Sequence, residues 1–235
     1  MTKHFERELD VLKRDILTMG IMVEESLTQA LRALATRDAE LAEQVIRADE
    51  WIDARENKID EECLKLLALY QPAASDLRFI TAVMKINGDL ERMADETVNI
   101  AERAAFLAGQ PKLAVDLPFD EMQERVRKMV KECLDALVNR DAALARSVCA
   151  ADDAVDDLNR RNYSTLLDVM RKDPAGIERG VMLLSVSRFL ERIADLATNV
   201  SEDVVYFVEG EIIRHHGLHD PTTPPPSWQA TRLER

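Results

Sequence analysis

Four pairs of acidic residues could do chemistry, because the two carboxylates of each pair lie four positions apart. The pairs are Asp49 and Asp53, Glu91 and Asp95, Asp152 and Asp156, and Glu191 and Asp195. Residues four apart share one face of a helix, where like charges repel by roughly a few tenths of a kcal/mol per pair. Grouped carboxylate oxygens are the ligands that hard divalent cations prefer. The eight residues are therefore candidate ligands for Mg²⁺, Ca²⁺, Mn²⁺ or Fe²⁺.

The pairs of each half are expected to meet across two neighbouring helices. The hydrophobic pattern places Asp49 about a dozen residues into a second helix and Glu91 about 15 residues into a third. In an antiparallel helix pair these positions lie at similar heights, so four carboxylates converge in each half. Asn99 and Glu102, one or two turns further along, are additional candidates.

An alternative interpretation treats the same pairs as solvated helix faces. Acidic residues commonly line the exposed side of a helix. Arg55, Arg92 and Arg192 stand close in sequence and would neutralise the carboxylates through ordinary surface ion pairs. Equivalent pairs in both halves favour a metal site, but a duplication copies inert features as well. The spacing alone leaves both interpretations open.

Long amphipathic helices must position these residues. Apolar residues recur at steps of four and three, which predicts a first helix of about 33 residues with a continuous buried seam. The seam consists of Phe5, Leu9, Leu12, Ile16, Met19, Val23, Leu27, Ala30 and Leu34. Further helices are predicted over residues 38–70 and 75–108, with Ser75 as the N-cap of the third. Gly88 lies inside the third helix, and a close helix–helix contact is expected to explain it.

The second half of the chain repeats this plan. Residues 31–53 align with residues 134–156, and residues 90–102 align with residues 190–202. The sequence therefore predicts an all-α fold of six long helices, arranged as two tandem antiparallel three-helix bundles. We expect the first repeat to span 1–110 and the second 111–216. A proline-rich tail over 217–235 is expected to be flexible, because it has too few apolar residues to order itself.

Composition restricts the classes of function. The 235 residues include 31 Lys and Arg against 44 Asp and Glu, a formal net charge of −13. This excess of acid argues against nucleic-acid binding and against direct docking on anionic lipid. No secretory signal or membrane-spanning segment is recognised. Cys63, Cys133 and Cys149 are expected to be reduced packing residues.

Motifs for catalysis are absent from the sequence. It contains no glycine-rich phosphate loop, no nucleophile elbow and no Cys-x-x-Cys. No histidine follows a helical glutamate at the spacing of the di-iron oxidase bundles. No cluster of arginines that would hold phosphate is recognised either. We therefore expect a protein that is not an enzyme.

Several motifs resemble those of the PhoU family of bacterial phosphate-signalling regulators. They are Thr18-Met19-Gly20, Met22-Val23-Glu24, Gln71-Pro72 with Ser75-Asp76-Leu77-Arg78, Leu90-Glu91-Arg92-Met93-Ala94-Asp95, Leu190-Glu191-Arg192-Ile193-Ala194-Asp195 and Tyr206-Phe207-Val208-Glu209-Gly210. The resemblance covers essentially residues 5–215 and implies two three-helix repeats. It also implies that the acidic pairs bind multinuclear clusters of a divalent or transition metal, such as Mg, Mn, Fe or Zn.

The resemblance further implies a role. Members of the family act at the cytoplasmic face with the high-affinity phosphate ABC transporter and a sensor histidine kinase, and they are often homodimers. They restrain phosphate uptake and the phosphate-starvation response when phosphate is plentiful. We therefore expect a cytoplasmic negative regulator that reaches the membrane only through its partners. The alternatives are a metal-binding or metal-storage bundle and a purely structural helical scaffold.

Overall fold

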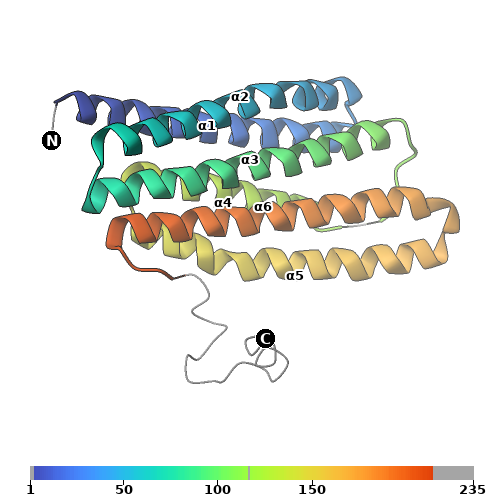
Figure 1. Cartoon of the computed structure of the whole chain (residues 1–235). Coiled ribbons are helices and arrows are strands. Elements are labelled where there is room, and N and C mark those ends of the chain that lie inside the picture. Colours follow the sequence, from blue (N-terminus) through green and yellow to red (C-terminus); the bar gives the residue numbers. More distant parts are fainter. Residues whose placement is uncertain (1–2, 116, 214–235) are drawn as a thin grey trace, which may run out of the picture.

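The computed structural model describes residues 3–115 and 117–213, and helices make up nearly all of this part of the chain (Figure 1). The helices are α1 (Lys3–Thr36), α2 (Ala39–Tyr70), α3 (Ala74–Ala108), α4 (Phe119–Asn139), α5 (Ala142–Lys172) and α6 (Ile177–Glu209), with a short 3-10 turn at Pro174–Gly176. The described residues contain no β-strand. The predicted all-α fold of six long helices is confirmed.

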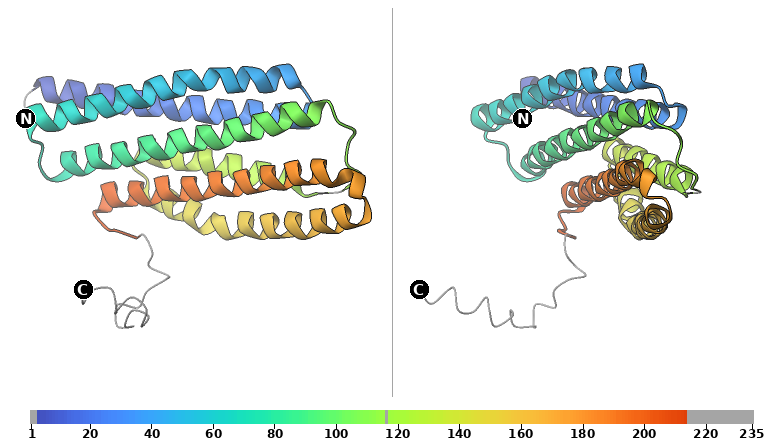
Figure 2. Two further views of the ribbon diagram at one scale, coloured as in Figure 1. Left: turned by 45° about the vertical axis from the view of Figure 1, so that its right-hand side comes forward. Right: turned by 90° about the vertical axis from the view of Figure 1, so that its right-hand side faces the viewer.

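Two antiparallel three-helix bundles lie side by side, as predicted. Helices α1, α2 and α3 contact one another, as do α4, α5 and α6. The bundles join mainly where α3 packs along α6, with a smaller contact between α1 and α4. Figure 2 shows α2 and α5 on opposite outer sides of this arrangement. The boundary expected between residues 110 and 111 falls between α3 and α4, and the tail at 217–235 lies outside the described residues.

The first helix buries the seam that the sequence predicts. Every apolar position from Phe5 to Leu34 in that seam is buried. Helix α1 also buries Gly20, where an added Cβ would lie 2.5 Å from Leu134 Cδ2 of α4. The missing side chain at Gly20 therefore lets the two bundles approach each other closely.

The repeated Arg-Asp-Ala sequence builds the same turn in both bundles. Arg37 and Arg140 adopt left-handed backbone conformations, with φ angles of 59° and 53°. The following residue caps the next helix in each case: Asp38 Oδ1 accepts a hydrogen bond from the Leu41 N–H at 3.0 Å, and Asp141 does the same in the second bundle. These caps satisfy otherwise free N–H groups at the starts of α2 and α5.

The core runs through both bundles as one cluster of apolar side chains. It includes Cys63 and Cys133, while Cys149 is half-buried, and all three thiols are free. Within the described part of the chain, none of the helices combines the length and the apolar character that a membrane crossing requires.

The expectation that Ser75 caps the third helix is wrong. Helix α3 begins at Ala74, and its N-cap residue, Ala73, has no side-chain acceptor. Gln71 ends α2 in a left-handed conformation, with its N–H donated to the Leu67 carbonyl at 3.3 Å. Because the chain turns within so few residues, Ser75 already lies in the first turn of the new helix.

The expectation of a close helix contact at Gly88 is also wrong. A Cβ built on Gly88 would meet no atom of the described residues within 4 Å. The close approach between helices occurs at Gly20 instead. Gly88 therefore leaves open space beside α3. The equivalent residue in the second repeat is Arg188.

We predict that Gly88→Ala stabilises the metal-free protein by up to about 1 kcal/mol, because alanine has the higher helix propensity. The added methyl group enters open space. Urea denaturation followed by circular dichroism measures the change. Gly20→Ala is the control and should give no gain, since its methyl group must displace Leu134. A destabilised Gly88→Ala protein would contradict the open space at this position.

Candidate functional site

The acidic pairs of α2 and α3 come together in the first bundle. Burial and the nearby charges of Asp53 and Asp95 raise the pKa of Asp49 to about 6. Burial, the charges of Asp95, Glu56 and Asp53, and a hydrogen bond with Asp95 raise the pKa of Glu91 to about 7. The structure therefore brings the four predicted carboxylates of this half into one electrostatically coupled group, the first acidic cluster.

Sequence reasoning missed Glu56, which belongs to the same group. Burial raises its pKa, and the charges of Asp60, Asp53 and Asp95 raise it further. The signal was present in the sequence, because Asp49, Asp53, Glu56 and Asp60 follow one another at steps of four, three and four. Such a series lies on one face of a helix. The first acidic cluster is therefore larger than the two predicted pairs.

A buried asparagine sets the register beneath this cluster. Asn87 of α3 is fully buried, and its Nδ2 donates to the Glu56 carbonyl oxygen and to Asp60 Oδ1, each at 3.0 Å. Leaving such a buried polar group without its partners costs about 1–3 kcal/mol. These two hydrogen bonds therefore help to hold α2 and α3 at the height where their carboxylates meet.

The second bundle brings together Asp152 and Asp156 of α5 with Glu191 and Asp195 of α6. Burial, followed by the charges of the other three and of Asp153, raises the pKa of Asp152 to about 6. Burial likewise raises the pKa of Glu191 and of Asp195. Asp152 Oδ1 and Glu191 Oε2 are buried without a hydrogen-bond partner. This second acidic cluster thus holds oxygen atoms that lack a partner among the described residues.

The three arginines expected as surface neutralisers form their ion pairs with other residues, although the charge of Arg192 also offsets part of the rise that burial causes in the pKa of Glu191 and of Asp195. Their partners are Asp15 for Arg55 at 3.1 Å, Asp89 for Arg92 at 2.7 Å and Glu96 for Arg192 at 3.0 Å. The two additional candidates are also held by neighbouring side chains, since Asn99 donates to Glu96 at 3.5 Å and Glu102 pairs with Arg103. Among the described residues, these three arginines form no ion pair with any of the eight predicted ligands.

Other arginines partly neutralise the second acidic cluster. Arg188 Nη1 lies 3.0 Å from Glu191 Oε1. Arg160 Nη1 lies 3.7 Å from Asp156 Oδ2. Both guanidinium groups are largely exposed, so water screens these pairs. The second acidic cluster nevertheless has positively charged side chains beside its carboxylates.

The first acidic cluster lacks these cations. Its residues equivalent to the two arginines are Gly88 and Asn57, and it has Glu56 where the second repeat has Asn159. Among the described residues, no lysine or arginine forms an ion pair with any of its four predicted ligands. All three sequence differences make the first cluster more negative than the second.

The donor sets of both clusters fit a hard cation. Each offers at least four carboxylates, and the second has buried oxygen atoms without partners. Within residues 3–115 and 117–213, however, no three acidic, cysteine or histidine side chains are grouped closely enough to hold a metal ion as they stand. Binding an ion therefore requires side-chain rotations, which are open to the exposed carboxylates of Asp53, Asp95 and Asp195.

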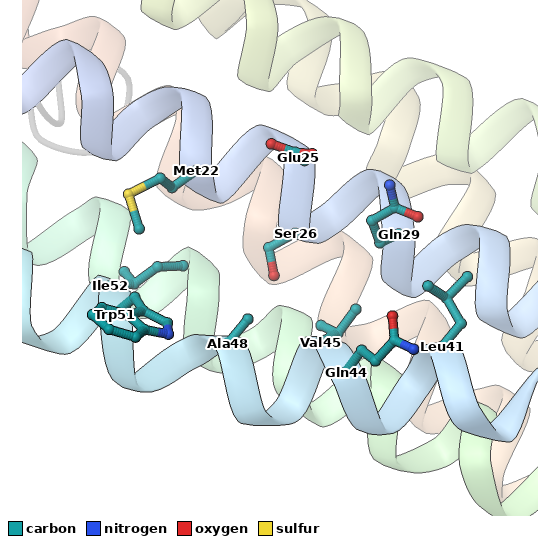
Figure 3. A pocket seen from close by; sticks show the side chains of 10 residues that line it. All are labelled: Met22, Glu25, Ser26, Gln29, Leu41, Gln44, Val45, Ala48, Trp51 and Ile52. Atoms are coloured by element: carbon teal, nitrogen blue, oxygen red, sulfur yellow. The ribbon is translucent and has the colours of Figure 1, made fainter.

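An apolar groove lies between α1 and α2, on the first bundle. It encloses about 420 Å³. Its walls are formed by Met22, Glu25, Ser26, Gln29, Leu41, Gln44, Val45, Ala48, Trp51 and Ile52. Figure 3 shows Met22 and Ser26 of α1 directed toward α2, with Trp51 and Ile52 across from Met22. Trp51 is 72% exposed, which leaves a large aromatic surface without cover.

The second bundle has different residue types at the equivalent place. The residues aligned with Met22, Glu25 and Trp51 are Arg125, Lys128 and Ala154. Arg125 is exposed and pairs with Glu121 at 2.9 Å. A three-helix repeat therefore folds without apolar residues at these positions. Packing within the bundle does not explain why the first bundle has Met22 and Trp51 there.

We predict that the metal-free protein loses stability as the pH rises from about 4 to about 7. Unfolded carboxyl groups titrate near about pH 4, whereas folded Asp49 and Asp152 titrate at about 6 and Glu91 at about 7. Between these values the folded state binds more protons than the unfolded state. Stability therefore falls as the pH rises through this window.

Urea denaturation in the presence of a chelator measures this dependence. Other groups also titrate in the window, so the comparison is with Asp49→Asn–Glu91→Gln, which removes two of the raised pKa values. The double variant should show a shallower loss of stability with rising pH. An equal slope in both proteins would contradict the electrostatic coupling of the first acidic cluster.

Comparison with known proteins shows the family. The model of the PhoU domain matches this chain twice, over residues 16–104 and 119–204. A phosphate-specific transport system accessory protein PhoU homolog from Aquifex aeolicus is 41% identical over 214 residues, covering 91% of this chain and 97% of the relative. The corresponding homolog from Pseudomonas aeruginosa is 40% identical over 221 residues, covering 93% and 90%.

Solved structures agree with the sequence relatives. The crystal structure of PhoU from Pseudomonas aeruginosa has a TM-score of 0.85 and 39% identity, covering 88% of this chain and all of that one. The phosphate transport system regulatory protein PhoU from Streptococcus pneumoniae has a TM-score of 0.80 and 32% identity, covering 89% and 99%. With two matching domains and relatives at this identity along nearly its whole length, the chain belongs to the PhoU family.

Proposed function

We propose that this chain is a non-enzymatic cytoplasmic regulator that restrains phosphate uptake and the phosphate-starvation response. It acts through contacts with a phosphate ABC transporter and a sensor histidine kinase, and as a homodimer. Its relatives are named as accessory proteins of phosphate-specific transport, which supports the link to phosphate. The observation that supports a dependence on metal is the first acidic cluster. Its carboxylates raise one another's pKa values and form no ion pair among the described residues.

The contacts depend on a divalent or transition metal, with Mg, Mn, Fe and Zn as the candidates. The ligands are Asp49, Asp53, Glu91 and Asp95 in the first bundle and Asp152, Asp156, Glu191 and Asp195 in the second. A bound cation would offset the repulsion within each cluster and attract acidic groups of a partner. The carboxylates of these residues hold the cation. As the pH falls through their pKa values they become protonated and lose affinity for it.

The apolar groove is the surface for a partner helix. Two adjacent helices leave a groove on each side, and α3 fills one side of the α1–α2 pair in this bundle. On α1, Met22, Ser26 and Gln29 line the open side at steps of four and three, which suits an amphipathic helix. Glu25 also lines the groove and the chain carries a net charge of −13, so the fitting helix has basic residues beside its apolar face.

Deletion of the gene tests the regulatory role. We predict constitutive alkaline phosphatase expression in phosphate-rich medium, and restored repression when the wild-type gene is supplied. The variant Asp49→Asn–Asp53→Asn–Glu91→Gln–Asp95→Asn should fail to restore repression, because its first acidic cluster holds no metal. Trp51→Glu should also fail, because it places a charge in the groove. Phosphatase activity per cell is the measurement.

The control for these variants is Asp168→Asn, which removes an exposed carboxylate that pairs with Arg171 outside both clusters. It should restore repression fully, and immunoblotting should find all variants at equal levels. Normal repression in the deletion strain would refute the regulatory role. Full repression by the fourfold variant would refute its dependence on metal.

The two acidic clusters should differ in their affinity for metal. We predict that Mn²⁺ binds the first cluster more tightly than the second, because among the described residues no arginine forms an ion pair with the predicted ligands of the first. Gly88→Arg should weaken binding there by about tenfold, the order expected for one added like charge at partly screened distance. Isothermal titration calorimetry of chelator-treated protein measures both affinities.

Gly88→Gln is the matched control, since it adds a long side chain without charge. The reciprocal change, Arg188→Gly, should strengthen binding at the second cluster. Two identical affinities that neither charge change alters would disprove the difference between the clusters. Unfolding curves of each variant establish that the fold is retained.

A further inference from the structure

A cavity with basic walls lies where the two bundles meet, at the end of the molecule where α3 begins and α6 ends (Figure 1). It encloses about 250 Å³. Three basic side chains line it: Lys13 from α1, Arg78 from the start of α3 and Arg140 from the end of α4. We call it the junction cavity. It shares no residue with the acidic clusters or with the apolar groove.

The two guanidinium groups in the junction cavity lack acidic partners. Among the described residues, neither Arg78 nor Arg140 forms a hydrogen bond or an ion pair through its guanidinium group. Arg78 Nε is buried with no hydrogen-bond partner. Elsewhere in this acidic chain, arginines such as Arg146 pair with carboxylates at 2.7 Å. Two guanidinium groups on one cavity therefore have N–H donors available for a ligand.

Arg140 does not play the role that its counterpart plays in the first repeat. Its counterpart in the first repeat, Arg37, donates to the carbonyl oxygens of Leu107 and Gln110 and so closes the end of α3. Arg140 makes no such bonds at the end of α6, and its guanidinium lies 5.6 Å from the centre of the Phe207 ring. Stacking on an aromatic face leaves the N–H groups at the edge of a guanidinium free to donate.

The remaining polar groups keep the cavity positive. Lys13 adds a third cation, although its ammonium already donates to Asp10 at 2.9 Å. Asp76 also lines the cavity and subtracts one charge, and Ser75 adds a hydroxyl group. The start of α3 offers free backbone N–H groups, since Ala73 gives no side-chain cap. The C-terminal end of α6 has a dipole opposite to that of the start of α3, so the two helix ends offset each other. The basic side chains therefore determine that the potential in the cavity is positive.

We infer that the junction cavity binds a phosphate group, either as inorganic phosphate or as the phosphoryl group of a nucleotide. Planar guanidinium forks match pairs of phosphate oxygens, and an ammonium and a hydroxyl group complete the donor set. Apolar walls at Phe79 and Phe207 lower the local dielectric and strengthen these bonds. The inference is independent of the metal proposal, because no acidic-cluster residue takes part.

Calorimetric titration of chelator-treated protein tests this inference, since metal-free protein cannot recruit phosphate through a bound ion. Inorganic phosphate and ATP are titrated separately. We expect one of them to bind, and Arg78→Gln and Arg140→Gln each to raise its Kd by about tenfold, the loss expected for one charge-assisted hydrogen bond. Arg171→Gln, which removes an exposed arginine on α5, should leave the Kd unchanged.

The two ligands distinguish the source of the phosphate group. Binding of inorganic phosphate identifies the free ion, whereas binding of ATP alone identifies a nucleotide. Arg78→Lys keeps the charge but loses the fork, so it should fold normally and bind more weakly than the wild type. Circular dichroism and the Tm of each variant exclude loss of fold as the cause. Absence of binding by both ligands, or wild-type affinity in Arg78→Gln–Arg140→Gln, would overturn the inference.

Discussion

The register between long antiparallel helices decides which carboxylates of this protein meet. In the first bundle it is held by the buried seam of α1, by the Asp38 cap and by the two hydrogen bonds of Asn87. A slip of one helical turn between α2 and α3 moves their side chains apart by about 5.4 Å. Such a slip would leave Asn87 buried without its acceptors and would separate Asp49 from Asp95. The same contacts that order the core therefore force carboxylates together.

Forcing carboxylates together creates a repulsion that the two bundles meet in different ways. The second bundle supplies Arg188 and Arg160 beside its carboxylates. The first has Gly88 and Asn57 at the equivalent positions. In both bundles carboxyl groups also hold protons to higher pH, since the pKa is about 6 for Asp49 and Asp152 and about 7 for Glu91. A duplicated fold thus carries two acidic clusters with unequal positive charge beside them.

The sequence was sufficient for features that depend on spacing within a helix. The seam from Phe5 to Leu34, the helix lengths and the duplication follow from local periodicity, and the same periodicity contained the signal for Glu56. Features that depend on the reach of side chains between helices were not predictable in this way. Arg55 contacts Asp15 of α1 rather than a neighbour on its own helix. At Gly88, the expected close contact between helices is absent, because no atom of the described residues lies within 4 Å of the position where its Cβ would be.

The junction cavity was beyond sequence reasoning for the same cause, because Lys13, Arg78 and Arg140 come from three helices and two repeats. This origin also separates it from the acidic clusters, each of which lies within one bundle. A cation in an acidic cluster would contact one pair of helices, whereas an anion in the junction cavity would contact walls from both bundles. A ligand favours the arrangement in which its contacts are made. A phosphate group at the junction would therefore stabilise one packing of the two bundles against each other. A metal ion would instead affect the acidic surface of a single bundle.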